Sequence, residues 1–219
     1  MFPLVLSLEV ATLATLLSCV VGVPLAALLG RTFRGRHALD TLVTLPLVLP
    51  PTVLGYYALG VFGRSSPLGK IFEELFGFPI VFTKMGAVIA ASIGALPIIV
   101  RMGSTAFSGV SEELIWAART LGASPFRAFV SIRLPLASRG IVAALMLSFA
   151  RALGDFGLTL MIAGNIPGET QTASLAIYDA LQAGDEGRAR SMAIVLTIVA
   201  AAILYTVGVL TERHRDREH

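Results

Sequence analysis

The sequence of 219 residues contains few charged residues, few histidines and one cysteine. Asp, Glu, Lys and Arg make up 14% of the chain, whereas ordinary soluble domains have about 25%. The single cysteine, Cys19, can form neither an intrachain disulfide nor a metal site of several cysteines. The three histidines, His37, His214 and His219, are too scattered to form a set of metal ligands. We therefore expect neither a disulfide nor a resident metal ion.

Apolar residues are present in excess. They make up 55% of the chain, and the mean hydropathy is +0.80. A soluble domain of this size cannot hide so much apolar surface, because many of its residues must face water. The composition therefore disfavours a soluble enzyme, a disordered chain and a nucleic-acid-binding protein. It predicts an all-α, polytopic helical membrane protein.

Five apolar stretches are long enough, or nearly so, to cross the ~30 Å hydrocarbon layer as helices. They cover residues 4–29, 42–62, 85–100, 141–163 and 191–210. The third is short, but Lys84 and Arg101 at its ends can reach the interface. The first could instead be a cleaved signal peptide, but no basic residue precedes Arg31 and the run is too long. We expect five transmembrane helices in a single domain, residues 1–219.

The basic residues indicate how the chain is oriented. The larger group falls in alternate connections and in the tail: Arg31, Arg34, Arg36, Arg101, Arg119, Arg127, Arg133, Arg139, Arg213, Arg215 and Arg217. The opposite side has only Arg64, Lys70, Lys84, Arg188 and Arg190. Positive charge is enriched on the cytoplasmic side of membrane proteins. We therefore expect the N-terminus outside the cytoplasmic membrane and the C-terminus, with the tail Thr211 to His219, in the cytoplasm.

Proline and small residues are frequent inside the expected spans. Pro50 and Pro51 lie in the second span and Pro97 in the third, where neighbouring helices or a cavity must satisfy the freed carbonyls. Pairs such as Ala87 and Ala91 are four residues apart and allow close helix approach. A packed bundle explains each proline singly, whereas together they favour bent helices around a pathway.

The connection formed by residues 101–139 predicts a helix–turn–helix bracket. It contains the residue types that start and stop helices: Ser111, Glu112 and Glu113 at a start, Gly122 at a stop, Ser124 and Pro125 at a second start, and Pro135 at the end. Residue spacing alone leaves open whether this bracket is only an amphipathic hairpin at the surface.

The bracket resembles the coupling loop of ABC importer permeases of type I. It has the family's spacing of two alanines, a glycine and an Ile-x-Leu-Pro sequence, carried by Ala117, Ala118, Gly122, Ile132, Leu134 and Pro135. Trp116 stands where the family usually has an acid, so Glu112 and Glu113 are the nearest acids. The resemblance implies that the bracket docks on a cytoplasmic ABC ATPase dimer and transmits its closure to the helices.

The fourth expected span contains two charged residues. Arg151 and Asp155 are four residues apart and therefore share a helix face. Charges at this depth are expensive and usually face a partner or a cavity. They form either an ion pair that fixes packing or part of a gate or anion pathway.

Polar residues follow the fourth span. Asn165 begins a turn, and Thr170, Gln171 and Thr172 offer neutral hydrogen-bond donors to a passing oxyanion, or else cap a turn. Together with Ala152–Gly157, Ala163–Gly168 and Ala176–Tyr178 they resemble molybdate and tungstate ABC permeases. Asp155 replaces the usual glutamate of that pattern. Sulfate and thiosulfate permeases share the first part of the pattern more than the second.

The resemblance implies a transport subunit without catalytic residues. The chain has no G-x-x-x-x-G-K-[ST] sequence, so ATP and Mg would bind to the partner ATPase. The expected partners are a second copy of the chain, the ATPase dimer, an extracytoplasmic oxyanion-binding protein and membrane lipid, but no nucleic acid. The expected cargo is molybdate or tungstate, with sulfate or thiosulfate as the alternative. A membrane-embedded enzyme would need a catalytic set such as paired acids or histidines inside the membrane, but Glu9 and Asp155 lie on different spans and no histidine falls in any span. A secondary transporter would usually show an internal repeat, and the sequence shows no convincing one.

Overall fold

The computed structural model describes residues 2–213, and within this range it contains helices but no strand. The helices are α1 (Phe2–Leu29), α2 (Arg36–Val48), α3 (Pro51–Phe62), α4 (Pro67–Phe76), α5 (Lys84–Ser108), α6 (Glu112–Thr120), α7 (Pro125–Ala128), η1 (Phe129–Arg133), α8 (Leu134–Leu153), α9 (Gly157–Ala163), α10 (Ala173–Gln182) and α11 (Glu186–Arg213). The expected tail lies mostly outside the described residues, including His214, Arg215, Arg217 and His219.

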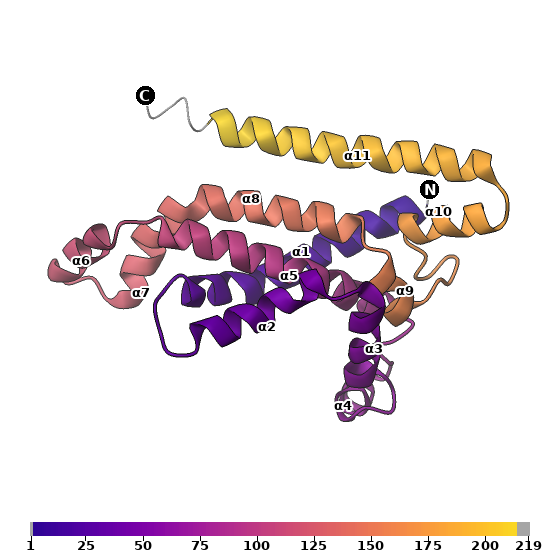
Figure 1. The fold of residues 1–219 in the computed structure, drawn as a ribbon, viewed down its shortest axis with the longest axis horizontal. Helices are drawn as coiled ribbons and strands as arrows, with labels where there is room; N and C mark the ends of the chain where they lie inside the picture. Colours follow the sequence, from indigo (N-terminus) through magenta and orange to yellow (C-terminus); the bar gives the residue numbers. More distant parts are fainter. Residues whose placement is uncertain (1, 214–219) are drawn as a thin grey trace.

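The long helices form an elongated bundle (Figure 1). α1, α5, α8 and α11 run along its length, α6 and α7 lie at one end, and α10 lies at the other. Within the described part of the chain, four helices are long and apolar enough to cross a membrane: Phe2–Leu29, Lys84–Ser108, Pro125–Leu153 and Glu186–Thr206. α2 and α3 pass the same test only as a pair, which is bent by 116°. This arrangement confirms the predicted all-α membrane fold class.

Three of the expected spans are broken or end at a clearly different residue in the structure. The stretch 42–62 is not one straight helix, because Pro50 and Pro51 start α3 in a new direction. The stretch 141–163 is broken after Leu153, where Gly154 ends α8 and Gly157 begins α9. The third helix does not end at Val100 but continues to Ser108, so the first part of the expected loop 101–139 is helical.

Small residues bring α1 and α5 into close contact. At every fourth position α1 presents Ala14, Ser18, Gly22 and Ala26, and α5 presents Ala87, Ala91 and Ala95, followed by Ile99 and Gly103. A Cβ atom on Gly22 would lie 2.9 Å from Cγ2 of Ile99. The Ser18 hydroxyl donates to the Ser92 carbonyl at 3.2 Å, and the Ser92 hydroxyl reaches the Ala14 carbonyl at 3.3 Å. The expected close approach at Ala87 and Ala91 is confirmed.

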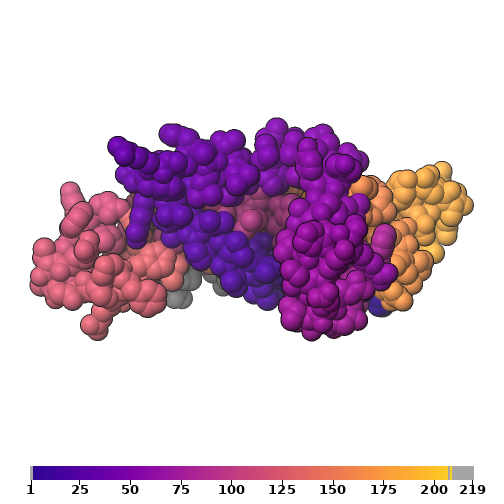
Figure 2. Space-filling view, turned by 90° about the horizontal axis from the view of Figure 1, so that it is seen from below, coloured from indigo at the N-terminus to yellow at the C-terminus, as the bar shows by residue number. Residues whose placement is uncertain are grey.

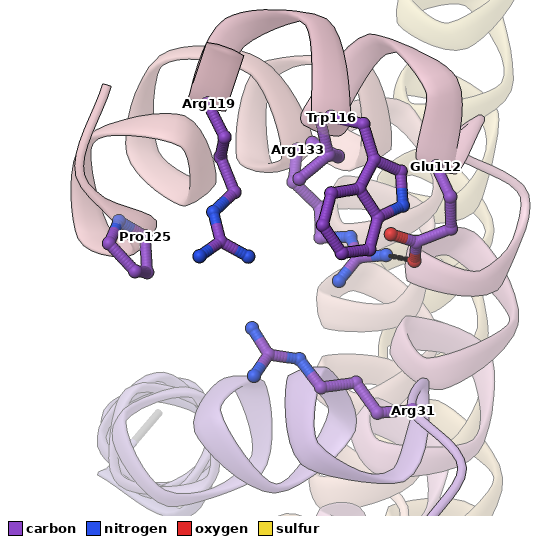
Figure 3. Close-up of a pocket in the computed structure, with 7 residues that line it drawn as sticks. Arg31, Glu112, Trp116, Arg119, Pro125 and Arg133 are labelled. Carbon is purple, nitrogen blue, oxygen red and sulfur yellow. Dashed lines mark hydrogen bonds and ion pairs between the residues drawn. The ribbon is translucent and has the colours of Figure 1, made fainter. Parts of the chain in front are cut away.

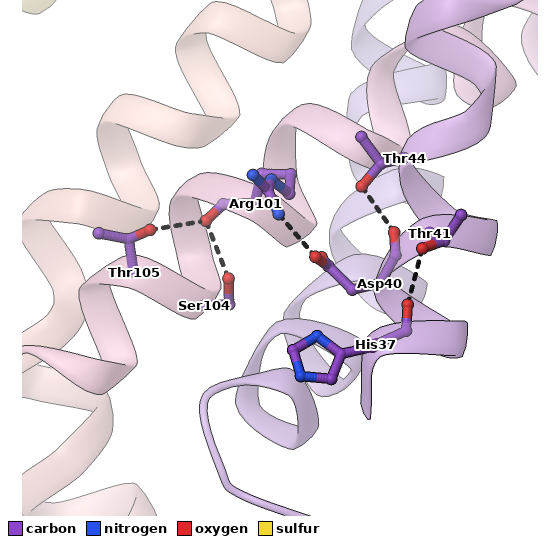
Figure 4. Close-up of polar contacts among 7 residues, drawn as sticks. All are labelled: His37, Asp40, Thr41, Thr44, Arg101, Ser104 and Thr105. Atoms are coloured by element: carbon purple, nitrogen blue, oxygen red, sulfur yellow. Dashed lines mark hydrogen bonds and ion pairs between the residues drawn. The ribbon is translucent and has the colours of Figure 1, made fainter. Parts of the chain in front are cut away.

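An ion pair joins α2 to α5 (Figure 4). Arg101 Nη1 donates to Asp40 Oδ2 at 2.7 Å, and both side chains are partly exposed. The sequence places Arg101 just beyond the third span, whereas the extension of α5 puts it within the helix, opposite α2. This ion pair therefore connects α2, the first of the two helices that meet at the bend, to α5 in the bundle.

Two parts of the chain project from the bundle (Figure 2). The bracket forms one end of the molecule, and the segment of α3 and α4 forms a bulge of its own. Large apolar side chains such as Val20, Val48 and Tyr205 are exposed on the outer helix surfaces. An apolar outer surface of this kind fits lipid or a second subunit.

Candidate functional site

The bracket begins each of its helices with a serine cap. The Ser111 hydroxyl accepts a hydrogen bond from the Glu113 amide at 3.2 Å, and Glu112 and Glu113 occupy the first turn of α6. The Ser124 hydroxyl accepts from the Arg127 amide at 3.2 Å, and Pro125 is at the start of α7. These caps confirm both expected helix starts, because capping is decided by residues within one turn.

Gly122 ends α6 in a left-handed conformation, with φ of +90°. Its amide donates to the Arg119 carbonyl at 3.0 Å, and the Ala123 amide donates to the Ala118 carbonyl at 3.0 Å. These two bonds form the Schellman motif that commonly closes a helix. Gly122 therefore stops the helix as expected, and Ala117 and Ala118 lie in its last turns.

The expected end of the bracket at Pro135 is wrong. A π-helical turn, Phe129–Arg133, leads without interruption into α8, and Pro135 lies in the first turn of that helix. The Leu134 amide donates to the Phe129 carbonyl, five residues earlier. The missing amide of Pro135 is tolerated there because the α-helical ladder is already interrupted. α7 and α8 are therefore parts of one long helix, which contains Ile132 and Leu134.

A buried arginine connects the two arms of the bracket. Arg133 lies in η1 and pairs with Glu112 at the start of α6, although the arms are far apart in sequence. Arg119 lies over the Trp116 ring, with its guanidinium carbon 5.4 Å from the ring centroid. Sequence reasoning missed the role of Arg133, because its partner is set by the fold of the turn.

The bracket also exposes two large apolar side chains. Leu121 is 89% exposed and Phe126 is 77% exposed, on either side of Gly122 and Ser124. Side chains of this kind at a projecting turn are typical of a surface that a protein partner covers. Sequence reasoning missed them, although both lie within the matched coupling-loop spacing.

The second group of candidate residues lies where α8 breaks. Asp155 follows the end of α8, yet its carboxylate still pairs with Arg151, with Oδ1 3.0 Å from Nη1. The other carboxylate oxygen accepts from the Thr159 amide at 3.0 Å and from its hydroxyl at 2.7 Å. The Asp155 carboxylate is therefore buried, paired with Arg151 and hydrogen-bonded to α9. The sequence offers the ion pair as one of two alternatives but does not predict the break, where Asp155 accepts a hydrogen bond from a free amide in the first turn of α9.

A cavity of about 480 Å³ opens at this break. Its lining comes from the two helix breaks: Pro51, Ala150, Arg151, Gly154, Asp155, Phe156 and Gly157. Gly94 on α5 makes room for the arginine, because a Cβ atom there would lie 3.2 Å from Arg151 Nη2. The Arg151 side chain is 36% exposed, so part of its guanidinium group is accessible. A positive group at the junction of two discontinuous helices can contact an anion.

The four polar candidates after the span do not line this cavity. Gln171 Nε2 donates to Asn165 Oδ1 at 3.0 Å and to Asp179 Oδ2 at 3.2 Å. The Thr170 hydroxyl accepts from the Ile166 amide at 3.1 Å. Thr172 is buried at the start of α10, and its hydroxyl has no partner among the described residues. This geometry favours the capped turn, and Asp179 is a member of it that sequence reasoning missed.

Comparison with known proteins identifies relatives over most of the chain. Residues 20–217 match the family described as "binding-protein-dependent transport system inner membrane component". The chain is 39% identical over 206 residues to the putative molybdenum transport system permease protein YvgM of Bacillus subtilis, covering 94% of this chain and 91% of that protein. It is 43% identical over 202 residues to the molybdenum transport system permease protein ModB of Escherichia coli, covering 91% and 88%.

The fold is also found among solved structures. An inward-facing MetNI methionine ABC transporter contains a chain that superposes with a TM-score of 0.73 at 18% sequence identity. The match covers 95% of this chain and 92% of that one. The arrangement of helices is therefore that of an ABC importer permease.

Proposed function

This chain belongs to the family of binding-protein-dependent transport inner membrane components, and we propose that it is the membrane subunit of a molybdate importer. The observation that carries the proposal is 39–43% identity over most of the chain to proteins named for molybdenum transport. The sulfate and thiosulfate alternative is not favoured, because these relatives match across the whole helical bundle. Tungstate remains a second cargo of the same size class in this proposal.

The protein is a multi-pass inner membrane protein and a transport subunit, with ATP hydrolysed by a separate ATPase. Our proposal adds that two copies of this chain enclose the pathway and that the ATPase binds ATP and Mg. It further adds that an extracytoplasmic oxyanion-binding protein delivers the cargo. The N-terminus is then outside and the C-terminus cytoplasmic, because the bracket and the Arg31 segment carry the excess positive charge.

The bracket is proposed as the ATPase contact. Leu121 and Phe126 supply apolar area at its tip, while Gly122 and the Arg133 to Glu112 ion pair hold the two arms in a fixed angle. The second arm continues through η1 into α8. Displacement of the tip is therefore carried along a continuous helix to its C-terminal end, where Arg151 is located.

Arg151 is proposed to contact the oxyanion in the pathway. Its charge is offset by Asp155, and Asp155 is held by Thr159, so the pair has no net charge in the low-dielectric region. The accessible part of the guanidinium can still donate to an anion in the cavity. Such a balanced pair attracts a dianion weakly, and weak binding allows release during transport.

The test is uptake of labelled molybdate by cells that lack their own high-affinity system. The cells express this chain with the proposed ATPase and binding-protein partners, and excess tungstate or sulfate is added as competitor. We expect uptake that tungstate blocks and sulfate does not. Uptake blocked by sulfate would move the cargo to the alternative, and absence of uptake by an assembled complex would reject both oxyanions.

A further inference from the structure

A second cavity, of about 190 Å³, lies under the bracket (Figure 3). Its charged lining consists of Arg31 from the connection after α1, Arg119 and Glu112 from α6, and Arg133 from η1. Arg31 and Arg119 extend from opposite walls, and their guanidinium groups are directed into the same space. Because a water molecule in the liquid takes up about 30 Å³, the cavity can hold one tetrahedral oxyanion with some water.

The charges around this cavity are not balanced. Three guanidinium groups face one carboxylate, that of Glu112, and this carboxylate is already paired with Arg133. Among the carboxylates whose side chains the structure describes, none forms an ion pair with Arg31 or Arg119. Two like charges that face each other across a small space repel, unless an anion lies between them.

Arg133 provides an independent sign of a missing partner. Its side chain is 6% exposed, and its Nε is a buried donor without a hydrogen-bond acceptor in the described chain. A buried guanidinium donor that is left unsatisfied is costly, and such groups usually have a protein or ligand acceptor. Additional negative charge in the cavity therefore stabilises this arginine as well as the two at the walls.

The cavity is distinct from the apolar tip of the bracket. Leu121 and Phe126, which are the most exposed apolar residues of the bracket, are not among its lining residues. Trp116, Ile115 and Pro125 form its apolar walls instead. A space that is this small, and that is separate from the partner surface, fits a diffusible anion better than an acidic side chain of a docked protein.

We propose that the cavity under the bracket is a binding site for a free tetrahedral oxyanion of the phosphate, sulfate or molybdate class. A bound oxyanion accepts hydrogen bonds from Arg31 and Arg119 and so bridges the connection after α1 to the bracket. It thereby sets the position of the bracket relative to α1. This site is separate from the pathway cavity at Arg151, and it requires neither the proposed cargo nor the ATPase.

The test is direct binding of radiolabelled inorganic phosphate to the purified full-length chain in nanodiscs of neutral phosphatidylcholine, which expose both membrane faces. The cavity variants are Arg31→Gln and Arg119→Gln. The matched controls are Arg34→Gln and Arg127→Gln, which remove arginines from the same two segments without touching the cavity lining. We expect saturable binding that each cavity variant weakens at least tenfold and that each control changes less than twofold.

Three results would overturn the proposal. The first is absence of saturable phosphate binding, and the second is an equal loss in all four variants, which would indicate diffuse attraction to positive charge. If phosphate does not bind and Arg119→Gln also abolishes capture of the ATPase, a partner's carboxylate is the occupant. The third result comes from nanodiscs in which anionic phosphatidylglycerol replaces part of the lipid, where loss of phosphate binding would assign the cavity to a lipid headgroup instead. Loss of molybdate uptake with phosphate binding intact would reject only the proposed function.

Discussion

Gly157 and Pro51 are in contact where two helices break: a Cβ atom on Gly157 would lie 2.6 Å from Cβ of Pro51. Gly157 begins α9 after the break in α8, and Pro51 begins α3 after the bend from α2. A second glycine strengthens this contact, since a Cβ on Gly55 would lie 2.6 Å from Cβ of Met161. The two short segments α3 and α9 therefore pack as a unit beside the cavity at Arg151.

The contact predicts that Gly157→Val separates α3 from α9. Overpacking of this kind costs about 1–3 kcal/mol, and here it also changes the shape of the cavity. We expect a lower thermal unfolding temperature in detergent and a large loss of molybdate uptake. Gly60→Ala in α3 is the control, because nothing lies within 4 Å of its Cβ position. Wild-type values for Gly157→Val in both measurements would contradict the packing.

Arg151 and Asp155 are expected to differ when each is replaced. Asp155→Ala removes the acceptor for Thr159 and leaves Arg151 unpaired, which costs about 1–3 kcal/mol since the arginine is partly exposed. Arg151→Gln also destabilises, because the buried Asp155 carboxylate keeps its bonds to Thr159 but loses its counter-charge.

Uptake of molybdate separates the two roles of this pair. Arg151→Gln is expected to reduce uptake per folded complex more than tenfold, whereas Asp155→Ala reduces uptake only as far as it reduces the amount of folded complex. If Arg151→Gln takes up molybdate at the normal rate, Arg151 has only a packing role and does not contact the oxyanion.

Gly122 is expected to be essential for coupling and dispensable for insertion. At a φ of +90° a β-branched residue is strained by about 1–2 kcal/mol or more, so Gly122→Val opens the Schellman turn and redirects the bracket tip. Asparagine tolerates this conformation, which makes Gly122→Asn the matched control. The measurement is ATP hydrolysis of the assembled complex, stimulated by the loaded binding protein. Stimulated hydrolysis that is equal in both variants would rule out a role for the turn geometry.

The packing of α1 against α5 predicts a strong effect of Gly22→Val. Its Cβ alone would lie 2.9 Å from Ile99 and 3.2 Å from Leu96, so the helices must separate at a cost of about 1–3 kcal/mol. Val20→Ala, on the exposed side of the same helix, is expected to change stability by less than 0.5 kcal/mol. The measurement is the thermal unfolding midpoint of both variants in detergent. Similar midpoints for Gly22→Val and Val20→Ala would contradict the close contact between α1 and α5.

Local signals made the bracket predictable. The caps at Ser111 and Ser124 and the stop at Gly122 each depend on a single turn, so residue types at fixed offsets were sufficient. Pro135 favours an end to the bracket that the structure does not have, because a π-helical turn absorbs the missing amide and no residue type marks such a turn.

Long-range contacts were not predictable in the same way. The apolar run continues on both sides of Gly154 and Asp155, so the sequence gives no sign that α8 breaks there. At the break, the Asp155 carboxylate pairs with Arg151 and Thr159. The turn at Gln171 is likewise completed by Asp179, which only the folding back of α10 brings close. Both cavities depend on segments that are distant in sequence, and a pattern of residue types does not reveal which side chains share them.

The measurement that tests the central claim most directly is energised uptake in proteoliposomes. The purified permease and ATPase are reconstituted so that the ATPase faces the interior of the vesicles, where ATP is enclosed. The loaded binding protein is added outside, together with labelled molybdate. The account predicts accumulation that requires ATP and the binding protein and that persists when ionophores remove all ion gradients. Accumulation that is independent of ATP and driven by an imposed ion gradient would contradict it.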